Sequence, residues 1–193
     1  THLLSHVLEQ AGLRAPMGGN MGVSAAEMAL KIKTGDLLRP DWLVMELSSY
    51  QIEAGPTLAP SIGIWTTLTP DHLERHGTLE AYRAIKRGLL QRSSLAIFNG
   101  DDADLNAHRS SLKSGIWVQT ATPCPDDQPA DFWIDDAGTI QARESGAMFP
   151  ADALAMPGAH NRQNQLLVTA AAIQIGLNAE QIAQGFRSFP GVP

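Results

Sequence analysis

The sequence predicts an α/β fold, with a mostly parallel β-sheet, helices on both of its faces and a small antiparallel annex. Two patterns carry this prediction. Short apolar runs alternate with helical stretches, as in a parallel sheet with crossover helices. From residue 130 to about residue 154 the runs are separated by the turn sequences DDAG and ESG, which favours antiparallel hairpins. With 193 residues, of which 44% are hydrophobic, the chain is large enough for one such domain.

Composition narrows the classes of function. A formal net charge of −6 and a pI near 5.4 argue against nucleic acid or an anionic membrane as the main partner. Cys124 is the only cysteine, so neither a disulfide framework nor a cysteine metal site is predicted. No apolar run approaches the length of a membrane span, and the first residues lack the features of a signal peptide. A soluble, cytoplasmic protein is therefore expected.

Four apolar runs are predicted to be strands. They cover residues 39–47, 61–68, 94–101 and 115–121. The polar sequences ELSS, TLTPDH and NGDD fall at the ends of the first three runs. Because the carboxyl ends of parallel strands share one edge of a sheet, functional residues are expected to gather there. Glu46 is thus expected at this edge and not in the core.

Four longer helices are predicted from apolar spacing and from capping residues, and Thr69 as cap, Pro70 at the first helical position and Gly77 as terminator predict a short helix in LTPDHLERHG. The first begins at residue 1 and ends at Gly12, the second covers residues 78–92 with Thr78 as N-cap, the third covers residues 160–176, and the last follows Asn178, where Gln181 completes a capping box. The chain starts within a helix and stops in the turn-like sequence SFPGVP. Both ends are therefore expected to continue in a longer protein.

Two patterns of carboxylate, hydroxyl and imidazole side chains mark candidate metal ligands. Glu46 with Ser48 and Ser49 offers the hard oxygen ligands that suit Mg²⁺, although a strand-end acid paired with a neighbouring cation explains the same pattern. His72 and His76 stand at i and i+4 in LTPDHLERHG, but the HExxH order of a zinc site is absent. Taken alone, that segment is better explained as a solvated turn.

Lys86 falls inside the apolar stripe of the predicted helix over residues 78–92. A lysine in this position either extends along the apolar surface to water or points into a functional site. The glycine-rich run GGNMG, residues 18–22, is weak evidence for a phosphate cradle. Asn161 and Asn164 stand on the first turn of a helix, where they either cap it or face a polar ligand.

The order of these motifs carries more information than any one of them. The runs GGNMG, ELSSYQ, LTPDHLERHG, YRAIK, NGDD, GAHNRQN and FPGVP follow one another along essentially all of the chain. This succession strongly resembles the central domain of Mur ligases. The resemblance implies a P-loop-type α/β domain whose nucleotide loop directly precedes Thr1. It also implies flanking N-terminal and C-terminal domains in a ligase of peptidoglycan synthesis.

The ELSSYQ run is most similar to members that add D-glutamate to UDP-N-acetylmuramoyl-L-alanine. In the implied reaction, the alanyl carboxylate attacks the γ-phosphate of ATP, and the glutamate amine then attacks the resulting acyl phosphate. Two Mg²⁺ ions are implied. Glu46 would hold the ion that bridges the β- and γ-phosphates, and His72 with a carbamylated Lys86 would serve the second. These three residues are the implied catalytic and metal-binding residues.

The resemblance assigns six more residues. Asn20, Ser48 and Gln51 are implied in substrate binding, and His160, Asn161 and Asn164 in nucleotide binding. The expected partners are UDP-N-acetylmuramoyl-L-alanine, D-glutamate and ATP, with no nucleic acid and no membrane, and the protein is expected to be a monomer. Two alternatives remain: another Mur-type ligase, including one that adds L-glutamate, and a non-catalytic UDP-sugar-binding domain. Thr67 stands where family members commonly show Asn.

Overall fold

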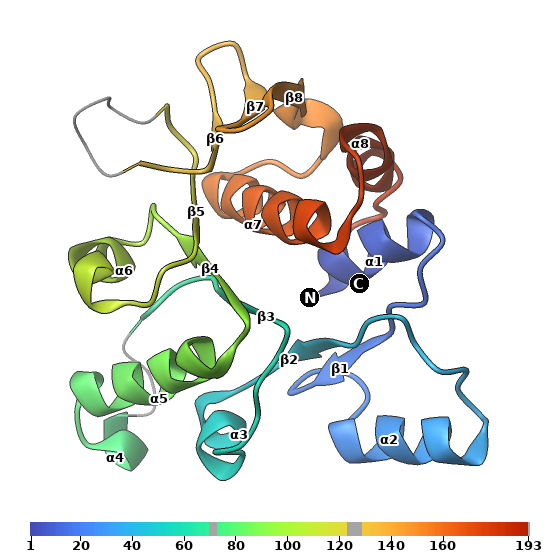
Figure 1. Ribbon diagram of the computed structural model, residues 1–193, viewed down its shortest axis with the longest axis vertical. Coiled ribbons are helices and arrows are strands. Elements are labelled where there is room, and N and C mark those ends of the chain that lie inside the picture. The colour runs from blue at the N-terminus through green and yellow to red at the C-terminus, as the bar shows by residue number, and fades with distance from the viewer. Residues whose placement is uncertain (70–72, 123–128, 193) are drawn as a thin grey trace.

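The computed structural model describes residues 1–69, 73–122 and 129–192 and confirms the α/β class (Figure 1). Its larger sheet has the spatial order β3-β4-β5-β6-β7-β8. These strands are β3 (Ile62–Trp65), β4 (Leu95–Asn99), β5 (Ile116–Gln119), β6 (Phe132–Ile134), β7 (Thr139–Ala142) and β8 (Gly146–Pro150). Neighbours from β3 to β6 are parallel, and those from β6 to β8 are antiparallel. The antiparallel strands therefore extend the main sheet.

A second, two-stranded sheet pairs β1 (Met17–Gly19) in parallel with β2 (Val44–Glu46). Only the first two residues of the run GGNMG, which was predicted to be a turn, belong to β1. The strand predicted over residues 39–47 is present but is limited to β2. The backbone N–H groups of Asp41 and Trp42 donate to the Arg14 carbonyl, so the chain bends there before β2 begins.

Helices cover both faces of the sheet, as predicted (Figure 1). One face carries α1 (His2–Gln10), α7 (Ala159–Ile175) and α8 (Ala179–Arg187). The other carries α3 (Ser49–Ala54), α5 (Leu79–Arg92) and α6 (Ala103–Ala107), with α4 (Leu73–His76) before α5. Two 3₁₀ turns span Arg109–Ser111 and Ala151–Ala153. Within the described ranges, no helix has both the length and the apolar character needed to span a bilayer.

Strand β4 shows how the sheet separates two cores. Ile97 packs into the core formed with α1, α7 and α8, whereas Ala96 and Phe98 pack into the core formed with α3, α5 and α6. All three side chains are fully buried. Because successive side chains of a strand point to opposite faces, a strand covered by helices on both sides must be apolar throughout. This requirement explains the continuous apolar run that predicted β4.

The predicted helix caps are present. The Thr78 hydroxyl accepts a hydrogen bond from the Ala81 N–H, and Asn178 and Gln181 form a reciprocal capping box. Helix α2 (Ala25–Thr34), which packs near β1, was not predicted. Its signal was present in the sequence, because the Ser24 side chain accepts from the Glu27 N–H and Gly35 ends the helix in a left-handed conformation.

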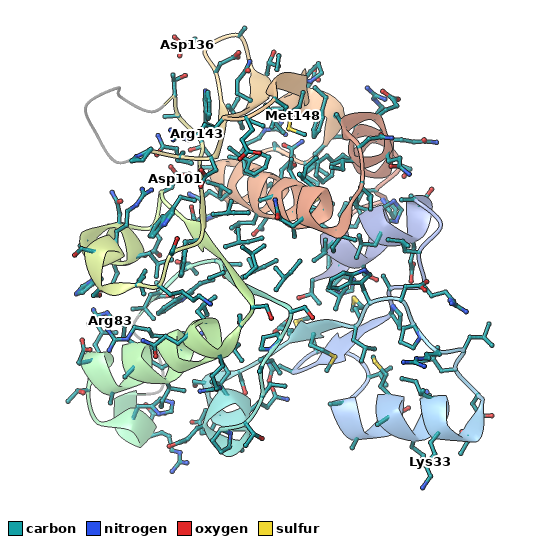
Figure 2. All side chains as sticks on the ribbon, in the orientation of Figure 1. Lys33, Arg83, Asp101, Asp136, Arg143 and Met148 are labelled. Carbon is teal, nitrogen blue, oxygen red and sulfur yellow. The ribbon has the colours of Figure 1, made fainter. Side chains whose placement is uncertain are left out.

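An ion pair joins α5 to α6, and its arginine, Arg83, is labelled in Figure 2. Arg83 is 8% exposed, and its Nε donates to Asp104 Oδ2 at 2.9 Å. Its guanidinium also bonds to the second Asp104 oxygen and to Glu80 on the preceding turn. The hydrogen bonds from Arg83 lower the pKa of the Asp104 carboxyl below its ordinary value. Since Lys86 lies on α5, this pair helps to set the position of that lysine.

We expect Asp104→Asn to lower the free energy of unfolding by about 3 kcal/mol at neutral pH, because it leaves Arg83 buried with only Glu80 as counterion. The lowered pKa of Asp104 means that its stabilisation is present above the ordinary carboxyl pKa of about 3.9 and is lost as pH falls through the folded-state value. The difference between wild type and variant should therefore shrink in acid. Urea titrations at several pH values measure it.

The exposed i,i+4 pair between Glu27 and Lys31 provides the control, with side chains 52% and 44% exposed. Glu27→Gln should cost only about 0.3–0.5 kcal/mol. An Asp104→Asn variant no less stable than Glu27→Gln would show that the Arg83 pair does not hold α5.

Gly19 lets β1 approach β2 closely. It has φ +110, and a Cβ at this position would lie 2.1 Å from the Glu46 carbonyl oxygen. Gly19→Ala should therefore cost about 3 kcal/mol, the left-handed penalty plus an overpacking term. Gly12 also has a positive φ, +87, but nothing lies within 4 Å of its Cβ position. Gly12→Ala should therefore lower the free energy of unfolding only by the left-handed penalty, about 1 kcal/mol. Equal losses of unfolding free energy in the two variants would contradict the close approach.

Candidate functional site

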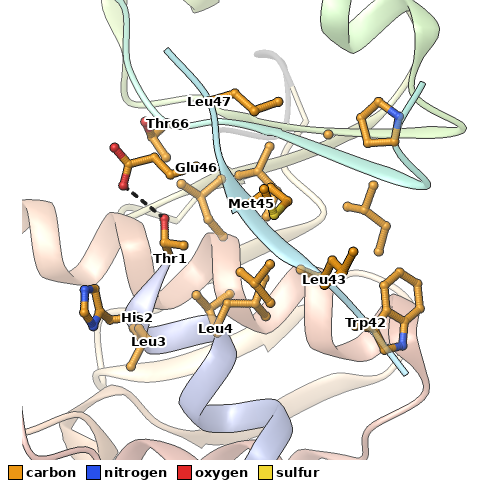
Figure 3. Close-up of a pocket in the computed structure, with 18 of the residues that line it drawn as sticks. Thr1, His2, Leu3, Leu4, Trp42, Leu43, Met45, Glu46, Leu47 and Thr66 are labelled. Atoms are coloured by element: carbon orange, nitrogen blue, oxygen red, sulfur yellow. Dashed lines mark hydrogen bonds between the residues drawn. The ribbon is translucent and has the colours of Figure 1, made fainter. Parts of the chain in front are cut away.

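A cavity of about 1160 Å³ lies between the two sheets (Figure 3). Its walls come from the start of α1, from β2 and β3, and from α5 and α7. Most of the lining is apolar and includes Val44, Met45, Ile62, Ile64 and Trp65. A few polar side chains, among them Glu46 and Lys86, interrupt this lining. The volume is slightly larger than that of most small-molecule pockets, at about 300–1,000 Å³.

Glu46 stands at the carboxyl end of β2 and lines this cavity, as expected. Its Oε1 accepts from Asn20 Nδ2 at 3.3 Å, and its Oε2 accepts a long hydrogen bond from Thr1 Oγ1 at 3.5 Å (Figure 3). Within the described part of the chain, these hydrogen-bond donors are thus a neutral amide and a neutral hydroxyl. The Thr1 amino group also interacts electrostatically with Glu46. Among the described residues no side-chain cation forms an ion pair with this carboxylate, which favours a site carboxylate over a strand-end acid in a side-chain ion pair.

Lys86 reaches the same cavity from α5. Its side chain is half-buried, and its ammonium lies 5.1 Å from the centre of the Tyr82 ring, within range of a cation–π contact. The structure therefore brings together Glu46 and Lys86, which are far apart in sequence. This placement favours the interpretation of Lys86 as a site residue over that of a lysine extending to solvent.

Ser48 and Gln51 have a defined local role at the start of α3. They form a capping box in which the Ser48 N–H donates to Gln51 Oε1 at 2.9 Å and the Gln51 N–H donates to Ser48 Oγ at 3.3 Å. Neither is among the described residues that line the cavity. Ser48 is half-buried and Gln51 is exposed, so both lie beside the end of β2.

The three residues at the start of α7 separate into two groups. Asn161 and Asn164 line the cavity, whereas exposed His160 is not among its described lining residues. The N-cap is Gly158, which provides no side-chain cap, and Asn161 Nδ2 donates to the Pro157 carbonyl at 2.7 Å. The helix-capping explanation for Asn161 is therefore wrong, because its side chain bonds to the preceding turn.

His72 and its neighbour Asp71 lie outside the described residues. The other histidine of the motif, His76, is half-buried and bonds through Nε2 to Ser49 Oγ at 3.0 Å. Its ring lies between those of Tyr50 and Tyr82, at centroid distances of 5.6 and 5.5 Å. The solvated turn expected here does not describe His76, because a hydrogen bond and two aromatic contacts hold it.

The donor set around Glu46 fits Mg²⁺ better than zinc. Among the residues that the structure describes, no three His, Cys, Asp or Glu side chains are grouped so that they could hold a metal ion. Zinc sites need three or four such ligands, whereas Mg²⁺ is commonly held by one or two carboxylates together with water and substrate phosphates. One carboxylate at the cavity wall, with no side-chain cation paired to it among the described residues, meets the second description.

Sequence reasoning did not assign Thr66 and Thr67 to the site, although both line the cavity. They directly follow β3, so their position after an apolar run was an available signal.

Relatives with similar sequences have been named. The chain is 84% identical over all of its residues to "UDP-N-acetylmuramoylalanine--D-glutamate ligase" of Synechococcus sp. (strain CC9902), of which it covers 42%. It is 43% identical to the protein of the same name from Gloeobacter violaceus (strain ATCC 29082 / PCC 7421), covering 41% of it. The chain thus spans less than half the length of these curated relatives.

Solved structures share the fold at low sequence identity. A pseudomurein peptide ligase type C from Methanothermus fervidus matches the whole chain with a TM-score of 0.72 at 15% identity, over 47% of its own length. The MurF ligase from Thermotoga maritima in complex with ADP matches with a TM-score of 0.66 at 17% identity, over 45% of its length. Residues 1–172 match the family described as "Mur ligase middle domain". The chain therefore belongs to the Mur ligase middle domain family.

Proposed function

We propose that the full-length protein is an ATP-dependent ligase that joins D-glutamate to UDP-N-acetylmuramoyl-L-alanine in peptidoglycan synthesis. The observation that carries this proposal is the cavity shared by Glu46 and Lys86, in a chain 84% identical to a relative named for that activity. Phosphoryl transfer depends mainly on positioning and on charge stabilisation. A carboxylate from β2 and a lysine from α5, which line the same cavity, provide such charges.

The gap between the sheets supports an upstream nucleotide loop. Both β2 and β3 line the cavity, and they belong to different sheets. Strand β2 pairs in parallel with β1, and β3 pairs in parallel with β4. We place in this gap a further strand that precedes Thr1 in the longer protein and leads into the expected nucleotide loop. Thr1 lies beside Glu46, so such a loop would deliver the ATP phosphates to that carboxylate.

Glu46 would hold the first Mg²⁺, and His72 with Lys86 the second. When bound, these ions neutralise the charge on the phosphates. Asn161 and Asn164, with His160 beside them, would contact the nucleotide from α7. A solved relative with this fold, MurF from Thermotoga maritima, is in complex with ADP.

Asn20, Ser48 and Gln51 would bind the muramoyl substrate. Asn20 already bonds to Glu46, and the Ser48–Gln51 capping box fixes the turn that follows it. A substrate bound by these three side chains would have its carboxylate near the transferred phosphoryl group. The same proposal includes that the full-length protein is a monomer and is located in the cytoplasm.

The direct test incubates the full-length protein with UDP-N-acetylmuramoyl-L-alanine, ATP, Mg²⁺ and D-glutamate, and detects the amide product, ADP and phosphate by mass spectrometry and a phosphate assay. L-Glutamate and other amino acids are tested in parallel. Preference for another amino acid would identify another Mur-type ligase. Binding of the UDP-sugar without ATP hydrolysis would support the non-catalytic alternative and overturn the proposal.

Glu46→Gln keeps the shape of the side chain but removes the charge that a divalent ion needs. We expect kcat of the full-length enzyme to fall by about 10²-fold or more, as when one electrostatic contact to a transition state is lost. Glu53→Gln is the matched control, because Glu53 is an exposed acid on α3 that pairs with Arg75 at 2.9 Å. A loss below about threefold for Glu46→Gln would indicate a structural acid.

We also propose that Lys86 is carbamylated in the full-length enzyme. Its neutral amine would attack CO₂ and lose a proton, giving a carbamate whose single negative charge is shared by two oxygens, a group that could hold Mg²⁺. Lys86→Ala should nearly abolish activity, and acetate should partly restore it by filling the vacated space. Lys33→Ala, on the exposed side of α2 (Figure 2), should leave activity unchanged.

Carbamylation is measured by ¹³C NMR of the enzyme under ¹³CO₂ and by assays after CO₂ removal. A labelled carbamate signal that disappears in Lys86→Ala is expected. An unchanged rate without CO₂, together with an active Lys86→Ala enzyme, would show that Lys86 is only a helix lysine.

A further inference from the structure

The chain leaves β3 through a loop, Thr66–Leu68, which is held by side chains at and just after the end of β4 and by the Trp65 indole, whose Nε1 donates to the Thr67 carbonyl at 3.2 Å. Asn99 Nδ2 donates to the Thr66 carbonyl at 2.8 Å. Asp102 Oδ2 accepts from Thr67 Oγ1 at 2.7 Å and from the Leu68 N–H at 2.9 Å. These bonds explain why β3 ends at Trp65, earlier than the sequence pattern predicted.

Both anchoring side chains have little freedom to reorient. Asn99 is 2% exposed, and its Oδ1 accepts from the Asp101 N–H at 3.0 Å, so both ends of its amide are used. The second oxygen of Asp102, Oδ1, caps α6 by accepting from the Leu105 N–H at 2.9 Å. A carboxylate can accept at both oxygens at once, whereas an amide presents a donor at one of them. Asp102 therefore ties the loop to the start of α6.

We propose that Asn99 and Asp102, both from the NGDD motif, are positioning residues that hold the Thr66–Leu68 loop at the wall of the ligation site. The inference rests on the proposed function. Thr66 and Thr67 are among the described cavity-lining residues together with Glu46 and Lys86, while Asn99 and Asp102 are not. The NGDD residues thus act through the loop, which leads along the chain towards His72.

Thr67 gives the proposal a conservative test. Its hydroxyl donates to Asp102, and the side-chain amide of Asn, the common family residue at this position, is also a donor. Thr67→Val removes the donor and keeps the volume. We expect kcat of the full-length enzyme to fall about tenfold in Thr67→Val, and Thr67→Asn to retain activity within about twofold.

Asp102→Asn should lower kcat by about 10- to 100-fold with a much smaller change in the KM for ATP, because a misplaced loop affects the reacting geometry more than binding. Asp101→Asn is the matched control. Asp101 is a neighbouring half-buried carboxylate that accepts from the Thr120 N–H at 2.9 Å and has no hydrogen bond to the loop among the described residues. The double variant Thr67→Val/Asp102→Asn should be no slower than Asp102→Asn alone.

Amide hydrogen exchange of Leu68 in the full-length protein provides a readout that does not require catalysis. We expect exchange at least about tenfold faster in Asp102→Asn and unchanged in Asp101→Asn. If wild type forms no amide product, the proposed function has failed, and the exchange data alone decide whether Asp102 anchors the loop. If Asp102→Asn does not fold, the Thr67 pair decides. A Thr67→Val enzyme as fast as wild type, or Asp101→Asn as slow as Asp102→Asn, would overturn the proposal.

Discussion

A carboxylate with neutral partners at the end of a strand is the constraint on which the rest of the site depends. Burying such a charge is unfavourable unless something compensates it. The protein places Glu46 at the wall of a large cavity and surrounds its oxygens with an amide and a hydroxyl. Neither of these hydrogen-bond donors carries a charge, so a cationic ligand would stabilise the carboxylate further. A divalent cation bound to a nucleotide polyphosphate would meet that need, because its positive charge is opposite to that of both the carboxylate and the phosphates.

The scaffold fixes the neighbours of this carboxylate through backbone geometry and helix ends. Gly19 allows β1 to run directly beside Glu46, the Ser48–Gln51 box begins α3, and Asp102 secures the loop after β3. Each of these three features lies near the end of a parallel strand, where neighbouring loops meet and the sheet no longer provides hydrogen bonds. In parallel α/β folds, ligands usually bind beyond the carboxyl ends of the strands for this reason.

The sequence predicted the elements whose signals are local. Helix α5 was predicted from the helical spacing of its apolar residues and from its Thr78 cap. The same spacing put Lys86 on the apolar face of the helix, and Lys86 lines the cavity. Strand β1 was missed because Met-Gly-Gly carries no β-branched or aromatic residue, and because its pairing depends on a partner more than twenty residues away. The bond between Asp102 and Leu68 spans 34 residues, and no local pattern encodes such a contact.

The account is tested most directly by a crystal structure of the full-length protein with Mg²⁺ and a non-hydrolysable ATP analogue. It predicts a strand between β2 and β3, the nucleotide phosphates beside Thr1, and a Mg²⁺ about 2.1 Å from a Glu46 oxygen. A nucleotide whose phosphates lie away from this cavity, with Glu46 remote from any metal, would contradict it.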